Sequence, residues 1–351
     1  MKFILVASTH SSSIDFVLST INMPVLNISW WNAGNFYHFL PEKSDLPRTR
    51  WPKSKEVYEE QLQFVDAAFS ELTTAVGKPD IAFFCEMTSE SLTHLRDKSF
   101  PNYRIISLDV LKGAPTLQIG ILFDESKGNV KFVEGEPIVV SGTPKGTRAM
   151  AVVDAICENF TIRFIACHWT SRFDEAASHR TRFRIADHLS KYIYQFLNDD
   201  RESRHCVVLG DLNEEPFDEN MAVLYAHRHR ARSKSKVHRA DDSVERAHMY
   251  NTSWRLMGEK IPHSATKSDA KFYDCAGTFY WESERTWHNF DQIIVSGGLL
   301  QDSVPFLDEN DVHVISTAKF LADGIPLKFK SDKGICSGLS DHLPLVAKIH
   351  I

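Results

Sequence analysis

Two polar side chains at the end of one apolar run are the first candidates for chemistry. Residues 205–216 read HCVVLGDLNEEP, so Asp211 and Asn213 directly follow a β-branched, apolar stretch and a glycine. Such a run is typical of a buried strand that ends at a sheet edge. Residues i and i+2 of an extended chain share a face, so the carboxylate and the carboxamide would grip one small target, a water molecule or a phosphate oxygen. The alternative is a strand that ends in an Asx turn.

Five other segments also bring a metal-binding or proton-handling side chain to the end of an apolar run. Glu86 follows four apolar residues and a cysteine, where burial of a carboxylate is costly unless a partner compensates it. A hard divalent cation is the natural partner, because magnesium binds through one or two carboxylates plus substrate phosphate and water. The alternative is a strand-end Glu bonded to a neighbouring loop. The other four segments carry Asn32, His168, Asp291, and the pair Asp341 and His342.

In their order and local context, these six segments resemble the endonuclease/exonuclease/phosphatase superfamily. Its members include deoxyribonuclease I, exonuclease III, inositol polyphosphate 5-phosphatases and neutral sphingomyelinases, and the match spans residues 27–351. The resemblance implies an α/β fold, a deoxyribonuclease I-like four-layer sandwich of two mixed β-sheets flanked by helices. It also implies hydrolysis of a phosphorus ester by in-line attack of water.

The resemblance assigns a role to each candidate. Glu86 and Asp341 are expected to hold Mg2+ (or Mn2+), Asp211 to take the proton from the attacking water, and Asn213 to orient that water. His342, steered by Asp291, and His168 with Asn32 are expected to stabilise charge on the transition state. Many members place a further polar contact shortly after the Asn, and here Asn35 is the candidate. The expected substrate-binding residues are Asn35, Arg172, Arg228, Arg230 and Arg232.

Two basic stretches suggest contact with a phosphate backbone. Residues 41–55 form a basic loop that contains Trp51, which suits phosphate contact and base stacking or is a solvated surface loop. In residues 228–236 the basic side chains alternate strictly, so an extended chain would carry them on one side. This basic run is therefore either a phosphate-tracking arm or a mobile solvated loop.

Three readings of the function follow. A nuclease or related phosphodiesterase that acts on nucleic acid comes first, because of the basic stretches. The alternative is a phosphatase or phospholipase-type enzyme acting on a phosphorylated head group, such as an inositol phosphate or sphingomyelin. Against it, Glu-Glu-Pro follows Asn213 where inositol 5-phosphatases commonly carry Tyr-Arg, and Trp-Cys does not precede Asp291. A binding module without catalysis is the third and least favoured reading. The candidate catalytic residues Glu86 and His342 and the Asp211 segment are all present, which argues against a loss of catalysis.

Regular elements must position these residues. Apolar runs predict strands at residues 25–31, 81–85, 104–107, 118–123, 130–134, 148–153, 161–167, 277–281, 291–296 and 344–351. Apolar side chains at three- and four-residue steps between Tyr58 and Val76 predict a helix that is stopped by Gly77. The same spacing from Ile185 to Phe196 predicts a second helix. We expect its Arg180, Arg182 and Arg184 to face solvent.

Composition bounds the class of protein. The 351 residues are 43% hydrophobic and 25% charged, as in ordinary globular proteins, and the net charge of −6 argues against a protein that coats nucleic acid with its whole surface. Six scattered cysteines and the short apolar opening predict a cytoplasmic protein without a membrane anchor. Because the motifs span the chain, we expect an extension or extra strand at residues 1–24 and one domain at 25–351. The oligomeric state is not predicted.

Overall fold

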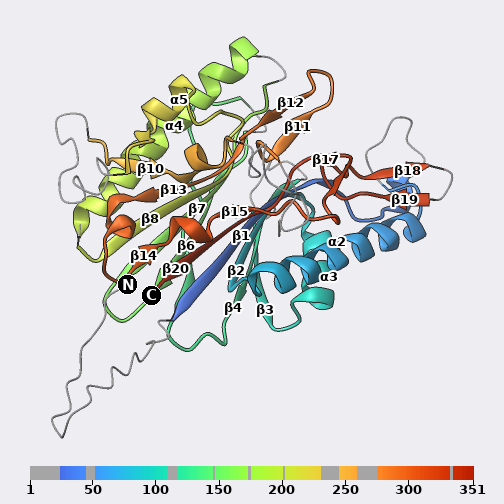
Figure 1. Ribbon diagram of the computed structural model, residues 1–351, viewed down its shortest axis with the longest axis horizontal. Helices are drawn as coiled ribbons and strands as arrows, with labels where there is room; N and C mark the ends of the chain where they lie inside the picture. The colour runs from blue at the N-terminus through green and yellow to red at the C-terminus, as the bar shows by residue number, and fades with distance from the viewer. Residues whose placement is uncertain are drawn as a thin grey trace, which may run out of the picture.

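Two mixed β-sheets form the centre of the structure (Figure 1). The computed structural model describes residues 24–44, 52–108, 117–144, 147–172, 175–200, 202–230, 245–258, 275–332 and 335–351. The first sheet has the strand order β14-β20-β1-β2-β4-β3, and β15 also pairs with β20. Its strands are β1 (Val25–Phe36), β2 (Ile81–Met87), β3 (Tyr103–Ser107), β4 (Gln118–Asp124), β14 (Phe306–Leu307), β15 (His313–Val314) and β20 (Leu345–His350).

The second sheet has the order β5-β6-β7-β8-β13-β10-β9. Its strands are β5 (Lys131–Glu134), β6 (Ala151–Ile156), β7 (Thr161–His168), β8 (Arg204–Asp211), β9 (Ala226–His227), β10 (Met249–Asn251) and β13 (Asp291–Ser296). Three small hairpins complete the strands: β11 (Phe279–Trp281) with β12 (Thr286–His288), β16 (Leu321–Ala322) with β17 (Ile325–Pro326), and β18 (Lys330–Asp332) with β19 (Ile335–Ser337).

Helices cover the outer faces of the two sheets. They are α1 (Pro41–Ser44), α2 (Lys55–Val76), α3 (Ser89–Ser99), α4 (Glu175–Asp199) and α5 (Glu219–Val223), with short 3-10 helices η2 (Thr252–Arg255), η4 (Gly297–Leu300) and η5 (Glu309–Asp311). Figure 1 shows α2 and α3 beside the first sheet, and α4 and α5 beside the second. The expected four-layer sandwich of two mixed sheets flanked by helices is confirmed. None of the helices in the described segments is long and apolar enough to span a membrane.

Alternation along the central strands builds two apolar layers. On β7, Phe164 belongs to the core between the sheets, whereas the next residue, Ile165, packs into the core beneath α4. Successive side chains of a strand point to opposite faces, which explains the division. The predicted helix at residues 58–76 is confirmed as α2, whose Ser54 side chain accepts the Val57 N–H and which ends at Gly77. Both layers hold the strand ends in fixed positions.

Some expected boundaries were wrong by a few residues. The strand expected at 148–153 is β6, Ala151–Ile156, and the strand expected at 277–281 begins only at Phe279. β1 continues to Phe36, past the expected end at residue 31. Strand ends depend on pairing with a neighbour, which the apolar pattern of a single segment does not contain.

The expectation that Arg182 faces solvent was wrong. Arg180 and Arg184 are exposed, but Arg182 is 0% exposed and its Nε donates to Oε1 of Glu214 at 2.5 Å. A helix turns by about 100° per residue, so residues two apart lie on nearly opposite sides. Arg182 precedes Ile185 by three residues and therefore shares the buried face of α4.

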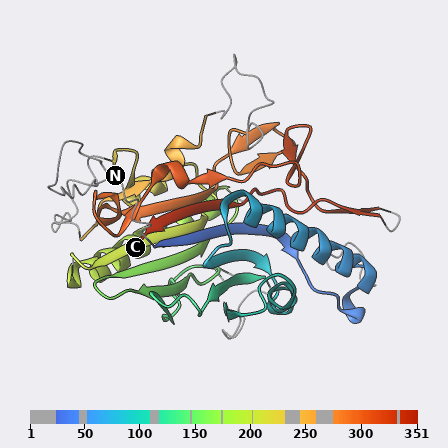
Figure 2. The same cartoon turned by 60° about the horizontal axis from the view of Figure 1, so that its bottom comes forward.

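The two ends of the described chain meet in one sheet. Figure 2 shows β1 and β20 side by side, and their register pairs Val25 with His350. Residues 1–23 lie outside the described residues, so the expected N-terminal extension stays a prediction, as does the single domain at 25–351. Residues 45–51 of the basic loop at 41–55, Trp51 among them, also lie outside the described residues.

Candidate active site

Three candidate side chains share one edge of the second sheet because they are cross-strand neighbours. His168 is the last residue of β7, Asp211 the last of β8, and Asp291 the first of β13. The register pairs Asp211 with His168 on one side and with Asp291 on the other. Nε2 of His168 lies 3.7 Å from Oδ2 of Asp211. Strand pairing therefore brings together residues that are far apart in the sequence.

Gly210 permits this close pairing of β7 and β8. Its φ is 154°, and a Cβ atom at this position would lie 2.0 Å from the carbonyl oxygen of Cys167. Any larger residue would push the two strands apart beside the pair formed by His168 and Asp211. This close approach explains why a glycine precedes Asp211.

The first sheet supplies Asn32 and Glu86. Asn32 lies within β1, not at a strand end as expected, but the register between β1 and β2 shifts directly after it. Asn35 and Glu86 have φ values of 61° and 58°, a left-handed conformation that costs a residue with a side chain about 1–3 kcal/mol and is concentrated at functional sites. In this arrangement the Asn35 N–H donates to Oε2 of Glu86 at 2.9 Å. Oε1 of Glu86 then lies 3.7 Å from Nε2 of His168.

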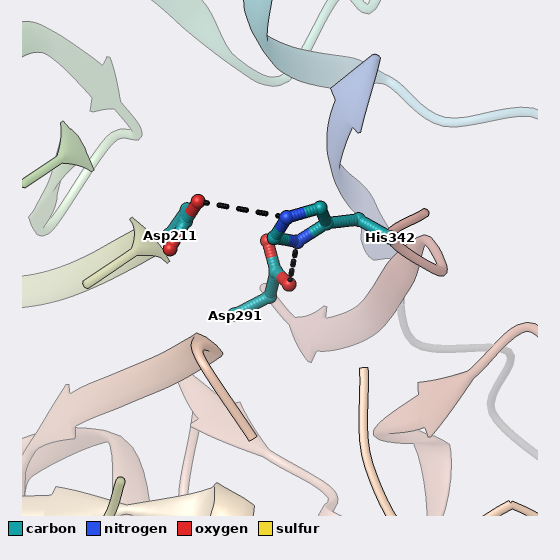
Figure 3. Close-up of side chains that lie close together, drawn as sticks. All are labelled: Asp211, Asp291 and His342. Carbon is teal, nitrogen blue, oxygen red and sulfur yellow. Dashed lines mark hydrogen bonds and ion pairs between the residues drawn. The ribbon is translucent and has the colours of Figure 1, made fainter. Parts of the chain in front are cut away.

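The imidazole of His342 lies between two carboxylates (Figure 3). Its Nδ1 is 2.7 Å from Oδ2 of Asp291, and its Nε2 is 3.9 Å from Oδ2 of Asp211. The other oxygen of Asp291 accepts a hydrogen bond from Nε1 of Trp30 at 2.7 Å. Asp291 is thus held on both oxygens and fixes the ring, whose Nε2 is too far from Asp211 for a direct hydrogen bond.

Burial and neighbouring charges give His342, His168 and Asp211 different protonation states. Burial alone would lower the pKa of His342, but the Asp291 carboxylate outweighs it and raises the pKa to about 10. Burial raises the pKa of Asp211 to about 7, which the positive charge of His342 partly opposes. Burial, helped by Arg148, lowers the pKa of His168 well below its ordinary value. At neutral pH His342 is a cation, His168 is neutral, and Asp211 can exchange a proton.

Hydrogen bonds orient the carboxylate of Asp211. Its Oδ1 accepts from the Asn213 N–H at 3.0 Å, and its Oδ2 accepts from Nδ2 of Asn32 at 3.0 Å. Nδ2 of Asn213 donates to the carbonyl oxygen of Trp169 at 3.1 Å. The carboxamide of Asn213 is therefore fixed between the ends of β7 and β8.

Arg172 contacts the loop that follows Asp211. Its Nε donates to the carbonyl oxygen of Asn213 at 3.0 Å, and a second guanidinium nitrogen reaches Oε2 of Glu214 at 3.3 Å and the carboxylate of Asp218. These contacts hold Asn213 at its φ of 50°. They give Arg172 a positioning role, and its expected contact with substrate stays a prediction.

The acidic side chains fit a divalent cation. Carboxylate oxygens of Glu86 and Asp211 each lie 3.7 Å from Nε2 of His168, whose neutral ring does not compensate them. The carboxylates that act on the cationic imidazole of His342 are those of Asp291, Asp211 and Asp341. Ligand atoms of Asp211, Asp291 and His342 lie within 4.8 Å of one another, but a protonated His342 bonded to Asp291 is a poor ligand. Glu86 remains the carboxylate most suited to a hard cation.

Asp341, the second expected metal ligand, is paired with a lysine side chain. Its side chain is 26% exposed, and its Oδ2 lies 2.8 Å from Nζ of Lys328. Burial opposes the effect, but His342 and Lys328 hold the pKa of Asp341 below its ordinary value. Because the ammonium group already compensates the carboxylate, metal binding by Asp341 requires displacement of Lys328.

The basic run is only partly described. The guanidinium carbon of Arg228 lies 5.7 Å from the ring centre of Trp254, whereas Nε of Arg230 lies 3.0 Å from Oε2 of Glu309. A second nitrogen of Arg230 donates to the carbonyl oxygen of Leu300 at 3.0 Å. Arg230 is thus engaged within the protein, and Arg232 lies outside the described residues.

Sequence reasoning missed several residues of the site. Oγ of Ser340 donates to the carbonyl oxygen of Asn32 at 2.7 Å and accepts the His342 N–H at 3.0 Å, which joins the segment before β20 to β1. Arg148 lies near enough to lower the pKa of His168. Arg148 precedes β6 and ends no apolar run, so the signal used for the other residues does not mark it. Nothing in the sequence distinguishes Trp30 from an ordinary apolar residue within a strand.

Comparison with known proteins agrees with this architecture. The model of the Endonuclease/Exonuclease/phosphatase family matches residues 37–350. A humanized D. rerio TDP2 carrying 14 mutations has 13% identity and a TM-score of 0.52, with coverage of 93% of this chain and 99% of that chain. D. rerio TDP2 complexed with a single-strand DNA product has 15% identity and a TM-score of 0.50, with 93% and 99% covered.

A mannosyl-6-phosphatase of Bacteroides thetaiotaomicron has 12% identity and a TM-score of 0.54, with coverage of 93% of this chain and 100% of that chain. At these identities the likeness shows the fold alone. None of the curated proteins matches the chain. The family match extends over most of the sequence, and the chain therefore belongs to the endonuclease/exonuclease/phosphatase family, whose members are phosphoesterase hydrolases.

Proposed function

We propose that this protein hydrolyses phosphodiester bonds of nucleic acid by in-line attack of water. The observation that best supports the reaction is the arrangement of His342 and Asp211, a cationic acid and a carboxylate with a pKa of about 7 whose nearest atoms are 3.9 Å apart. A general base works best when its pKa lies near the working pH, and a fixed cation stabilises the charge that develops on phosphate.

In this mechanism Asp211 accepts the proton of the attacking water. Asn32 and Asn213 hold its two oxygens in place, so the base needs little reorganisation when the reaction occurs. His342 points its Nε2–H toward the reacting phosphate. Asp291 accepts a hydrogen bond from Nδ1 and keeps the imidazole protonated. His168 is neutral and supplies a hydrogen bond at the same place.

A divalent cation, Mg2+ (or Mn2+), held by Glu86 and by Asp341 would neutralise the phosphate oxygens and the leaving alkoxide. The Asn35 N–H orients Glu86 for this role. Asp341 joins only when Lys328 moves away from it.

Nucleic acid is the proposed substrate because of the side chains around the loop that leaves Asp211. Phe217 is 60% exposed on this loop, and its ring centre lies 6.4 Å from that of Trp254. Arg228 lies over the other ring of this pair, Trp254. An exposed ring and a half-buried ring beside a cation suit bases and phosphates of a single strand. The likeness in fold to TDP2 with bound single-strand DNA supports the same reading.

A cytoplasmic location is part of the proposal. Five cysteines, Cys85, Cys157, Cys167, Cys206 and Cys275, are free thiols. Free thiols are typical of a reducing compartment.

The test is an incubation of purified protein and Mg2+ with single-stranded DNA, duplex DNA, RNA and a panel of inositol phosphates. We expect shorter fragments from at least one nucleic acid and no inorganic phosphate from the inositol phosphates. Intact nucleic acids with release of inorganic phosphate would replace the proposal by the head-group phosphatase.

A further inference from the structure

Strand β11 and the turn that follows it line a cavity beside the candidate active site. This cavity, the aromatic pocket, has a volume of about 290 Å³ and is lined by Phe279, Tyr280, Trp281, Pro326, Lys328 and Asp341 among others. Three consecutive aromatic residues of β11 and the ion pair of Lys328 and Asp341 contribute to the lining. The chemistry described above uses none of the aromatic side chains.

The aromatic pocket begins one side chain away from the catalytic imidazole. The ring centres of Phe279 and His342 are 4.6 Å apart with 36° between their planes, and the two residues also form an isolated β-bridge. A group bound in the pocket would therefore lie next to a phosphate that contacts Nε2 of His342. The pocket is placed to receive the part of a substrate that is attached to the reacting phosphate.

Trp281 lies on the face of β11 that points toward the site. Residues 279 and 281 share one face of the strand, and the ring centres of Phe279 and Trp281 are 6.2 Å apart at 67°. On the opposite face, Tyr280 contacts Trp287 at 5.4 Å. His288 lies 5.7 Å behind Trp281 and is itself fixed by Oε1 of Glu215, which is 2.7 Å from its Nδ1. Trp281 is thus a supported, partly exposed ring.

We propose that the aromatic pocket binds one base of the substrate by stacking on Trp281. Pockets for drug-sized ligands measure about 300–1,000 Å³, so this cavity suits one planar ring system and no larger group. Bases stack on aromatic side chains irrespective of their identity, because every base presents a π-face. Lys328 offers a donor to the edge of that ring. The inference deepens the proposed function and rests on it for the identity of the substrate.

The test compares two ligands that differ only in the base, a deoxynucleoside 5′-monophosphate and 2-deoxyribose 5-phosphate. Their dissociation constants are measured by calorimetry with Mg2+ present, in an Asp211→Asn background that consumes neither ligand. We expect the nucleotide to bind about 5- to 150-fold more tightly, the range for stacking of one base. Equal affinity of the two ligands would overturn the base pocket.

Two substitutions of Trp281 separate stacking from folding. Trp281→Phe keeps a planar ring and should keep most of the preference for the nucleotide. Trp281→Leu keeps an apolar side chain but not the ring, and should bring the two dissociation constants together with the affinity for the sugar phosphate unchanged. A full preference for the nucleotide in Trp281→Leu would also overturn the proposal.

The proposed function can fail separately from the base pocket. If the nucleotide preference depends on Trp281 but no nucleic acid is cut, the pocket stands and the nuclease activity is wrong. If nucleic acid is cut but the two ligands bind equally well, the nuclease activity stands and the pocket is wrong.

Discussion

Nδ1 of His342 lies 2.7 Å from Oδ2 of Asp291, while Nε2 of the same ring faces Asp211 from 3.9 Å. Because Asp291 is buried and also accepts the Trp30 N–H, it stays fixed and keeps His342 protonated. The carboxyl group that faces Nε2, that of Asp211, has its pKa raised to about 7, so it can exchange a proton near neutral pH. The two carboxylates around one ring therefore have different tasks.

This difference predicts a bell-shaped dependence of kcat/KM on pH. Activity should rise as the pH rises through about 7, where Asp211 loses its proton, and fall through about 10, where His342 loses its proton. Asp291→Asn removes the negative charge that raises the pKa of His342, so the alkaline limb should move to lower pH. An alkaline limb at the same pH in both proteins would show that Asp291 does not set the charge of His342.

Removal of the base or of the acid should mainly affect the chemical step. We expect Asp211→Asn and His342→Ala each to lower kcat by at least ~100-fold, the lower end of one general base or one charge stabiliser. KM should change far less, because other contacts bind the substrate. Steady-state kinetics on a short oligonucleotide measures both values. Near-normal kcat in both variants would mean that the reaction occurs elsewhere.

Metal binding should depend on Glu86 and respond to Lys328. We expect chelator to abolish activity and Glu86→Gln to raise the Mg2+ concentration needed for half-maximal rate. Lys328→Met frees Asp341 and should lower that concentration, whereas Asp341→Asn should raise it. The increase of the melting temperature with added Mg2+ gives a second measurement, independent of turnover. If neither Asp341→Asn nor Lys328→Met changes the Mg2+ requirement, Asp341 is not a ligand.

The buried pair of Arg182 and Glu214 should matter for stability. Arg182→Met removes the fully buried cation from Glu214, which keeps Arg172 at 3.3 Å, so we expect a loss of up to about 3–5 kcal/mol, the value for a buried charge left wholly unpaired. The matched control is Arg184→Met, an exposed arginine two residues later on the same helix. Denaturant unfolding of the two variants gives the comparison. Equal free energies of unfolding would show that the pair does not stabilise the fold.

Arg228 and Arg230, the two described arginines of the basic run, should contribute differently to oligonucleotide binding. Arg228→Ser should flatten the log-log salt dependence of oligonucleotide binding by about 0.7–0.9, the value for one lost phosphate contact. Arg230→Ser should change this slope less, because Arg230 is paired with Glu309. Binding titrations between low and moderate salt measure both slopes. A parental slope in Arg228→Ser would remove Arg228 from the nucleic-acid contact.

Local patterns in the sequence sufficed for much of the fold and for the strand-end residues. The four-layer sandwich follows from the resemblance, and the apolar runs before Glu86, His168 and Asp211 mark the ends of β2, β7 and β8. The glycine before Asp211 is explained only by the structure, because the carbonyl that it avoids belongs to Cys167 on another strand.

What the sequence did not provide are contacts between distant segments. The bond from Ser340 to the backbone of Asn32 spans 308 positions, and no local pattern encodes it. The same holds for Lys328, whose ion pair with Asp341 alters the expected metal site. Arg182 was expected to face solvent, but its position on the helix is buried.

The most direct measurement of the central claim is a competition in one reaction. The protein, Mg2+, a labelled single-stranded oligonucleotide and mannose 6-phosphate are mixed, and oligonucleotide fragments and inorganic phosphate are quantified together. The ratio of the two rates gives the ratio of the kcat/KM values for the two substrates. A phosphodiesterase of nucleic acid predicts fragments without inorganic phosphate, and no fragments with Asp211→Asn. Release of inorganic phosphate from mannose 6-phosphate while the oligonucleotide stays intact would contradict it.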